Sequence, residues 1–172
     1  GYGHGAEAIA RLIEGYEYIW GFAAATAEEA IQLKDAGVKK PVLILGLVFE
    51  EYFQELIQKE VRMTVCDYDM AKALSEEAVR QGRQVHIHIG LDTGMSRIGF
   101  ADKPESVEEI KRIAALSNIE IEGMFTHFAT ADEADQIQYT DYVGLMMSSV
   151  TTIINAISYV LIAFVAISLV VS

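Results

Sequence analysis

Three short segments of the 172-residue chain combine glycines with side chains that can donate protons or hold a charge. They are YGHG at residues 2–5, DTGMSRIGF at residues 92–100 and FTHFATADE at residues 125–133. These segments carry a phenol, imidazoles, carboxylates and a guanidinium, which are the groups used in acid–base chemistry and anion binding. Each segment alone also fits an ordinary loop, with glycines in turns and a histidine hydrogen-bonded locally. The elements around them decide between these interpretations.

Apolar runs and amphipathic stretches alternate along residues 1–141. The amphipathic stretches predict five helices, of which the first carries Ile9, Leu12 and Ile13 on one face and the fourth follows Asp69. Two further helices begin with the capping-box spacing, at Thr26 with Glu29 and at Ser106 with Glu109. The apolar runs are rich in Val, Ile and aromatic residues and predict five buried strands, at residues 18–23, 42–47, 61–66, 85–91 and 119–125.

This alternation predicts an α/β fold with parallel strands and right-handed crossovers. Two architectures fit, an open doubly wound sheet and a partial (β/α)8 TIM barrel. A complete barrel needs about 250 residues, so residues 1–141 supply about five βα units of one. In both architectures, chemistry collects where strands end and the following loops begin. Because the three segments all lie at such positions, we expect them to form one site.

A metal site is the alternative that the histidines raise. His86 and His88 point to one side of a predicted strand, as two metal ligands would. No carboxylate or third histidine lies near them in the sequence, so a structural role is favoured and we predict no metal. The single cysteine, Cys66, cannot form an internal disulfide and indicates no oxidising compartment.

The chain is acidic, with 25 Asp and Glu against 13 Lys and Arg and a formal net charge of −12. Nucleic acids and anionic lipid surfaces both require a clustered positive face. We therefore expect no nucleic-acid partner. Because Cys66 gives no sign of an oxidising compartment, we expect a cytoplasmic location for the charged part of the chain.

The motifs YGHG, DTGMSRIGF and GMFTHFATADEAD, in this order, resemble the alanine racemase family. The resemblance covers residues 1–137. It implies a pyridoxal 5'-phosphate (β/α)8 barrel joined to a C-terminal β domain, with the active site completed across a homodimer. It also implies an isomerase that interconverts L- and D-alanine and supplies D-alanine for peptidoglycan.

The resemblance assigns roles to three residues of this sequence. Tyr2 would hydrogen-bond the cofactor phosphate, and His127 would lie beside the pyridine ring. Arg97 would face the substrate carboxylate and the phenolic oxygen of the cofactor, a role suited to a planar, permanently charged fork. Without the motif, a surface salt bridge from Arg97 to a carboxylate such as Asp92 would be the favoured interpretation.

The sequence also departs from the family pattern. The family's cofactor-binding lysine lies just upstream of YGHG, and this sequence begins at Gly1, one residue before that motif. We therefore expect the 172-residue chain by itself to be inactive. Lys34 and Lys40 are no substitutes, because both lie on or after a helix and away from the strand ends. Gly90 stands where many relatives carry a modified lysine beside the arginine.

The end of the chain has a different composition, because residues 142–172 carry no charge. As a helix, residues 150–171 would span roughly 33 Å, enough to cross a bilayer core of about 30 Å. We therefore expect a transmembrane helix over residues 150–172, a junction over 138–149, and membrane association through this segment. From residue 139 the sequence is also similar to a membrane helix in permeases of lipoprotein-release-type ABC transporters, which suggests a chimeric chain. A permease fragment and a non-catalytic pyridoxal-phosphate-binding barrel are the alternative functions.

Overall fold

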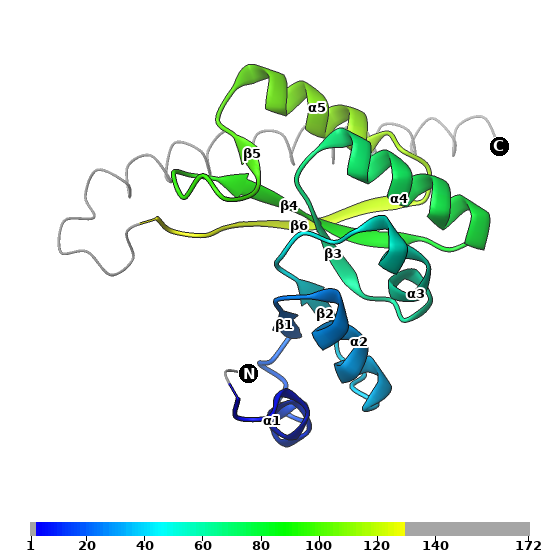
Figure 1. Cartoon of the computed structure of the whole chain (residues 1–172), viewed down its shortest axis with the longest axis vertical. Coiled ribbons are helices and arrows are strands. Elements are labelled where there is room, and N and C mark those ends of the chain that lie inside the picture. The colour runs from blue at the N-terminus through cyan, green and yellow to red at the C-terminus, as the bar shows by residue number, and fades with distance from the viewer. Residues whose placement is uncertain (1–2, 130–172) are drawn as a thin grey trace, which may run out of the picture. The chain divides into compact units, whose positions relative to one another are not determined.

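The computed structural model describes residues 3–129 (Figure 1). Strands and helices alternate through them as the sequence predicts, and the first three strands are short while β4 and β6 are long. In chain order the elements are α1 (Ala6–Ile13), β1 (Phe22–Ala24), α2 (Ala27–Asp35), β2 (Val42–Ile44), η1 (Glu50–Tyr52), α3 (Phe53–Gln58), β3 (Arg62–Val65), α4 (Tyr68–Gln81), β4 (Val85–Asp92), β5 (Phe100–Ala101), α5 (Pro104–Ala114) and β6 (Ile119–Thr126).

All strand pairs in these residues are parallel, as predicted. Along the sheet the strands follow the order β1-β2-β3-β4, and β6 pairs with the other edge of β4. Apart from the two-residue strand β5 (Phe100–Ala101), each strand is thus added beside the one before it, which is the order of a (β/α)8 barrel. A doubly wound sheet reverses direction at a switch point, and these strands do not. The topology therefore favours the barrel segment over the doubly wound alternative.

The two-residue strand β5 is an element that the sequence analysis missed. It pairs only with the end of β4, at Leu91 with Phe100 and at Asp92 with Ala101. The strand is too short to give a periodic signal in the sequence. It closes the loop that carries the DTGMSRIGF motif back onto β4.

Helix caps explain where the helices begin, and one predicted cap is wrong. At α2 the capping box is present, because the Thr26 side chain accepts from the Glu29 N–H and the Glu29 carboxylate accepts from the Ala25 N–H. Helix α5 instead begins at Pro104, two residues before Ser106, without a side-chain cap. The Glu109 carboxylate accepts from the Tyr68 N–H, 2.7 Å away at the start of α4.

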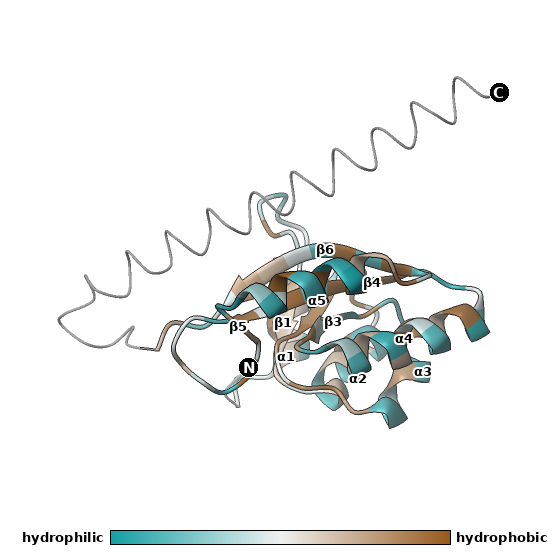
Figure 2. Cartoon of the chain, turned by 90° about the horizontal axis from the view of Figure 1, so that it is seen from above, coloured by the Kyte–Doolittle hydropathy of each residue, from teal (hydrophilic) through white to brown (hydrophobic). Residues whose placement is uncertain are grey.

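The core lies between the sheet and α2 to α5, with hydrophilic residues along the outer faces of the helices (Figure 2). On β4 the residues alternate, with Val85, Ile87 and Ile89 buried and His86 and His88 only half-buried. Helix α4 contacts β3, β4 and β6 and contributes buried residues on one stripe, Ala71, Leu74, Ser75 and Ala78. One face of β4 therefore packs against helices, and the opposite face carries its histidines.

Two expectations for the start of the chain need correction. The first strand is Phe22–Ala24 rather than residues 18–23, because residues 18–21 form turn and irregular structure that leads into it. The expected apolar face of α1 is largely exposed, with Leu12 77% exposed, and only Ala10 of this helix is buried. Periodicity identified the helix but not what it packs against.

The expected transmembrane helix at residues 150–172 and the junction before it lie outside the described residues, as does Tyr2. Within residues 3–129, no helix has both the length and the apolar composition that a bilayer crossing requires.

Candidate active site

A cavity of about 990 Å³ opens at the carboxyl ends of the strands. This is where the parallel fold predicts chemistry. Its volume is at the upper end of the range for small-molecule sites. It is lined by residues in the carboxyl-terminal parts of β1, β4 and β6, by residues that follow β1, β2, β4 and β6, by Gly3 before α1 and by Glu29 of α2. The lining residues are Gly3, Ala23, Ala24, Ala25, Glu29, Leu45, Gly46, Leu47, Gly90, Leu91, Met95, Arg97, Ile98, Phe125, Thr126 and His127.

The loop that carries Arg97 is held in shape by its own motif. The Asp92 carboxylate accepts from the backbone N–H of Gly94, at 3.0 Å, and from that of Ser96, at 2.8 Å. At the other end of the loop Gly99 has a φ of +112°, and a Cβ there would lie 2.8 Å from the Asp92 nitrogen. Only glycine fits this position, so the motif DTGMSRIGF specifies a compact turn over the end of β4.

Arg97 itself is exposed at the cavity, and within residues 3–129 its guanidinium has no hydrogen bond or ion pair. The salt bridge to Asp92, which we considered as the alternative role, is absent among residues 3–129, where Oδ1 of that carboxylate accepts from two backbone N–H groups of the loop. A guanidinium with free donors beside a cavity can bind an anionic group, and its fork suits a carboxylate or phosphate.

His127 comes directly after β6 and lines the same cavity as Arg97. The structure therefore brings together two of the three predicted site residues, which are 30 positions apart in the sequence. The third, Tyr2, is not among the described residues, although its neighbour Gly3 lines the cavity.

Gly90 also lines the cavity, in a narrow part of it. A Cβ at this position would lie 3.1 Å from Cγ2 of Thr64 and 3.3 Å from Sγ of Cys66. Burial raises the pKa of the Cys66 thiol, which disfavours a thiolate at this point. Lys34 and Lys40, which we did not expect to replace the family lysine, do not line the cavity: Lys34 lies in α2, and the Lys40 ammonium donates to the Tyr16 and Ile19 carbonyl oxygens.

The small and apolar part of the cavity wall was not predicted from the sequence. Ala23 and Ala24 end β1, Ala25 follows it, and Leu45 to Leu47 follow β2. Their positions after strands were the available signal, but their side chains carry no chemistry that would single them out. Gly46 permits close packing there, since a Cβ would lie 2.4 Å from the Ala25 carbonyl oxygen.

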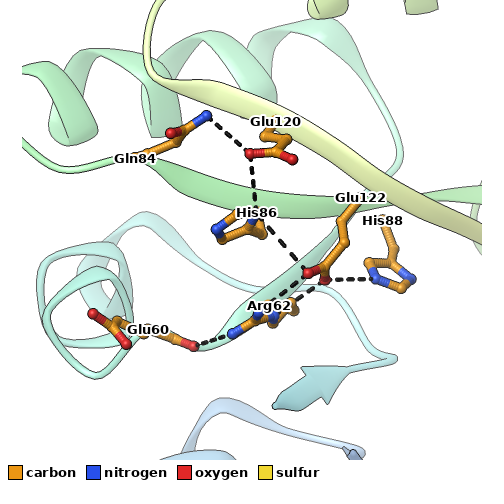
Figure 3. A network of polar contacts seen from close by, with 7 residues as sticks. All are labelled: Glu60, Arg62, Gln84, His86, His88, Glu120 and Glu122. Carbon is orange, nitrogen blue, oxygen red and sulfur yellow. Dashed lines mark hydrogen bonds and ion pairs between the residues drawn. The ribbon is translucent and has the colours of Figure 1, made fainter. Parts of the chain in front are cut away.

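A second cluster of polar side chains lies on the half-buried face of the sheet, nearer the amino ends of the strands (Figure 3). Arg62 on β3 donates from Nε and Nη2 to the two carboxylate oxygens of Glu122 on β6, both at 3.1 Å. His88 Nε2 lies 3.3 Å from the same carboxylate. Burial raises the pKa of the Glu122 carboxyl, but the hydrogen bond and charge of Arg62, together with His88 and His86, outweigh it and hold this pKa below its ordinary value.

This cluster contains His86 and His88, the two histidines that raised the alternative of a metal site. Both rings lie on one side of β4, as predicted, and contact glutamates of β6. His86 Nδ1 is buried 3.4 Å from Glu120, without hydrogen-bond geometry. We predicted no carboxylate near the histidines, and this prediction is wrong. The parallel pairing of β4 and β6 brings glutamates next to them from 34 positions further along the chain. Among the described residues no group of three or more His, Cys, Asp or Glu has a geometry that could hold a metal ion.

Comparisons with known proteins agree with this geometry. Residues 1–168 match the family model "Alanine racemase, N-terminal domain". Over 141 residues the chain is 39% identical to alanine racemase of Methanococcus maripaludis, covering 81% of this chain and 37% of that protein. Over 137 residues it is 42% identical to alanine racemase of Clostridium tetani, covering 78% of this chain and 35% of that protein.

The structural match is also close. The alanine racemase of Clostridium difficile, solved in complex with cycloserine, superposes with a TM-score of 0.81 and 36% identity over 88% of this chain and 42% of that chain. The fold and the cavity define a parallel α/β barrel segment with its site at the carboxyl ends of the strands. The chain belongs to the alanine racemase N-terminal domain family. It spans about a third of the length of the curated relatives it matches.

The comparisons do not support the permease resemblance of the end of the chain. The family model extends to residue 168 and so includes most of the residues in which we saw that resemblance. An apolar composition is shared by many unrelated helices, and this similarity had no specific motif behind it.

Proposed function

We propose that this chain forms part of the active-site barrel of a pyridoxal-phosphate-dependent racemase that interconverts L- and D-alanine. The observation that carries the proposal is the guanidinium of Arg97, which has no hydrogen-bond or ion-pair partner among residues 3–129 and shares a cavity at the strand ends with His127. The motif around Arg97 has the structural basis described above, and the identity to alanine racemases is about 40% over most of the chain.

The residues present fit pyridoxal phosphate. The cavity is large enough for a substituted pyridine ring and an amino acid together. Leucines and alanines form an apolar wall, while Arg97 supplies a positive charge to a cofactor and substrate that are both anionic. Gly3, Gly46 and Gly90 leave backbone accessible where larger side chains would reduce the space.

In the proposed mechanism the side chains of this chain bind and orient the cofactor and the amino acid. Pyridoxal phosphate, when bound, supplies an electron sink that makes the α-proton of an amino acid acidic. Arg97 binds the substrate carboxylate and the phenolic oxygen, which fixes the direction in which the Cα–H bond points. By analogy with the family, His127 would lie beside the pyridine ring of the cofactor, and Tyr2 would donate to its phosphate. Two bases on opposite faces of the substrate exchange the proton, and by analogy with the family these are a lysine and a tyrosine.

The partner proposed for the intact protein is a second copy of itself, as in the family. A non-catalytic barrel that binds pyridoxal phosphate is the closest alternative, and it differs in the absence of proton exchange at Cα.

A graft tests the proposal in the context of a complete enzyme. Residues 2–137 of this chain replace the matching segment of the Clostridium tetani alanine racemase, and the conversion of L-alanine to D-alanine is followed with the cofactor present. We expect racemisation by the graft. In the same graft Arg97→Lys keeps the charge but loses the bidentate fork, and we expect kcat/KM to fall by about 10² or more.

The matched control is Arg80→Lys, because Arg80 is exposed on α4 and, among residues 3–129, forms its ion pair with Glu77 alone. This control should keep the activity of the graft. A folded, cofactor-loaded graft without racemisation would favour the non-catalytic alternative. Equal activity of the Arg97→Lys and Arg80→Lys grafts would contradict the role given to Arg97.

For residues 150–172 we propose membrane association, on the basis of the uncharged composition of this segment. The proposal concerns this segment alone and is separate from the function of the barrel.

A further inference from the structure

The side chains of Thr93 and Thr126 form a hydrogen bond between the two segments that carry the candidate site residues. Their hydroxyl oxygens are 2.7 Å apart, and the residues are 33 positions apart in the sequence. Thr93 is only 3% exposed, so its hydroxyl has little access to water as an alternative partner.

This bond lies at the point where the backbone pairing of the two strands ends. The last pair of the β4–β6 ladder is Leu91 with Thr126. Beyond it, β4 continues into the loop of Arg97, and β6 continues directly into His127. The hydroxyl pair therefore links Thr93, two residues beyond Leu91, to Thr126 of the last backbone pair.

The loop of Arg97 is otherwise fixed mainly to its own strand. Asp92 binds the backbone of Gly94 and Ser96, and β5 pairs with the end of β4. These contacts define the shape of the loop, but they do not set its distance from β6. A contact that joins the loop to β6 is needed for that, and Thr93–Thr126 is one.

We propose that Thr93 and Thr126 are positioning residues that set the spacing between Arg97 and His127 across the cavity. The inference rests on the proposed function, since it assigns the pair to the binding of the cofactor and amino acid at that site. Neither hydroxyl takes part in the reaction. The pair acts through Arg97 and His127, so its loss changes where those two groups lie.

The experiment compares five variants of the full 172-residue chain. Thr126→Val and Thr93→Val remove one hydroxyl each and keep the shape of the side chain, and the double variant removes both. Thr126→Ser restores the hydroxyl. The matched control is Ser75→Ala, which removes a buried hydroxyl that donates to the Ser117 carbonyl oxygen at 2.6 Å, on the helical side of the sheet.

The first measurement uses the chain without ligand. Amide hydrogen exchange is followed at Gly94 and Ser96, whose N–H groups are held by Asp92, and the ring resonances of His127 are recorded by NMR. Thr126→Val should increase both exchange rates by about tenfold and shift the His127 resonances. Thr126→Ser should match the wild type. Ser75→Ala should leave these signals unchanged even if it lowers the overall stability.

The second measurement is the binding of pyridoxal phosphate by equilibrium dialysis. We expect each valine variant to bind about five- to tenfold more weakly than the wild type and the double variant to bind no more weakly than either, because both changes break one contact. Thr126→Ser should bind within about twofold of the wild type.

The two measurements separate the two claims. If Thr126→Val leaves the Gly94 and Ser96 exchange rates and the His127 resonances as in the wild type, the positioning role is wrong. If these signals change as expected but the wild-type chain does not bind pyridoxal phosphate, the pair does set the spacing and the assigned cofactor is wrong. Additive losses in the double variant would also overturn the inference, since they would mean two independent contacts.

Discussion

Glu122→Gln is the substitution that most directly tests how much the polar cluster on the half-buried face of the sheet contributes to stability. Glu122 on β6 receives both bonds of the Arg62 fork and lies next to His88. Because Arg62 is on β3 and Glu122 on β6, their pairing crosses β4 and joins three strands. Glutamine has nearly the size of glutamate and keeps one acceptor oxygen. The change therefore removes the negative charge and one of the two hydrogen bonds from Arg62 without creating a cavity.

The expected loss in the free energy of unfolding lies between the values for exposed and for buried ion pairs. Exposed ion pairs contribute about 0.2–1 kcal/mol, and breaking a fully buried pair costs about 3–5 kcal/mol. The side chains of Arg62 and Glu122 are 17% and 24% exposed, so water screens the pair only in part. We therefore expect Glu122→Gln to lower the free energy of unfolding by about 2 kcal/mol near neutral pH.

The pH dependence follows from the lowered pKa of the Glu122 carboxyl. A carboxyl whose pKa is lowered in the folded state stabilises the protein above its ordinary value of 4.5, and this stabilisation is lost as the pH falls through the folded-state pKa. The difference between wild type and Glu122→Gln should thus be complete near neutral pH. It should shrink in acid, where both proteins carry an uncharged side chain.

Urea unfolding followed by circular dichroism, near neutral pH and in acid, measures this difference. Glu108→Gln is the control, because Glu108 pairs with Lys111 at 2.8 Å on the surface of α5, with side chains 70% and 52% exposed. It should cost less than about 0.5 kcal/mol. The reasoning is refuted if Glu122→Gln costs no more than the control, or if its cost is the same in acid as at neutral pH.

Three further predictions concern other parts of the chain. Gly99→Ala should destabilise the protein by about 2–3 kcal/mol, because its φ is +112° and its Cβ would meet the Asp92 nitrogen at 2.8 Å, whereas Gly15→Ala, with open space around it, should be tolerated; thermal melts compare the two. Thr26→Ala should cost about 1 kcal/mol in urea unfolding, since it removes the acceptor for the first turn of α2. Ala163→Arg should reduce membrane integration of residues 150–172 in a glycosylation-reporter insertion assay by about 2.5–3.5 kcal/mol, and an unchanged result would exclude a membrane-spanning role.

The strands and most helices could be predicted because hydrophobic periodicity reports burial directly. Four of the five predicted strands lie within a few residues of those observed. The second capping box failed because Ser106 and Glu109 have the right spacing but a proline two residues earlier starts the helix. Glu109 then becomes free to cap α4, a tertiary contact that no local pattern records.

The polar cluster shows a second limit on what can be predicted from the sequence. His86 and His88 were recognised as sharing one side of a strand, which depends only on alternation. Their partners Glu120 and Glu122 depend on which strand pairs with β4 and in which register, and a shift at Ile87/His88 displaces that register by one residue. Sequence alone gives the alternation but not the register.

The two roles considered for Arg97 show how structure decides between a surface ion pair and a binding residue. Asp92 is close in sequence and opposite in charge, so a salt bridge was the simpler expectation. Oδ1 of the carboxylate instead accepts from two backbone N–H groups of the loop, while the guanidinium on the surface remains hydrated. Since Asp92 shapes the loop, Arg97 keeps its donors and presents them at the cavity. A motif with both residues therefore needs the aspartate for the turn and the arginine for the ligand. Replacing Asp92 alone would release the loop that presents Arg97, whereas replacing Arg97 alone would leave the turn intact and remove the binding group.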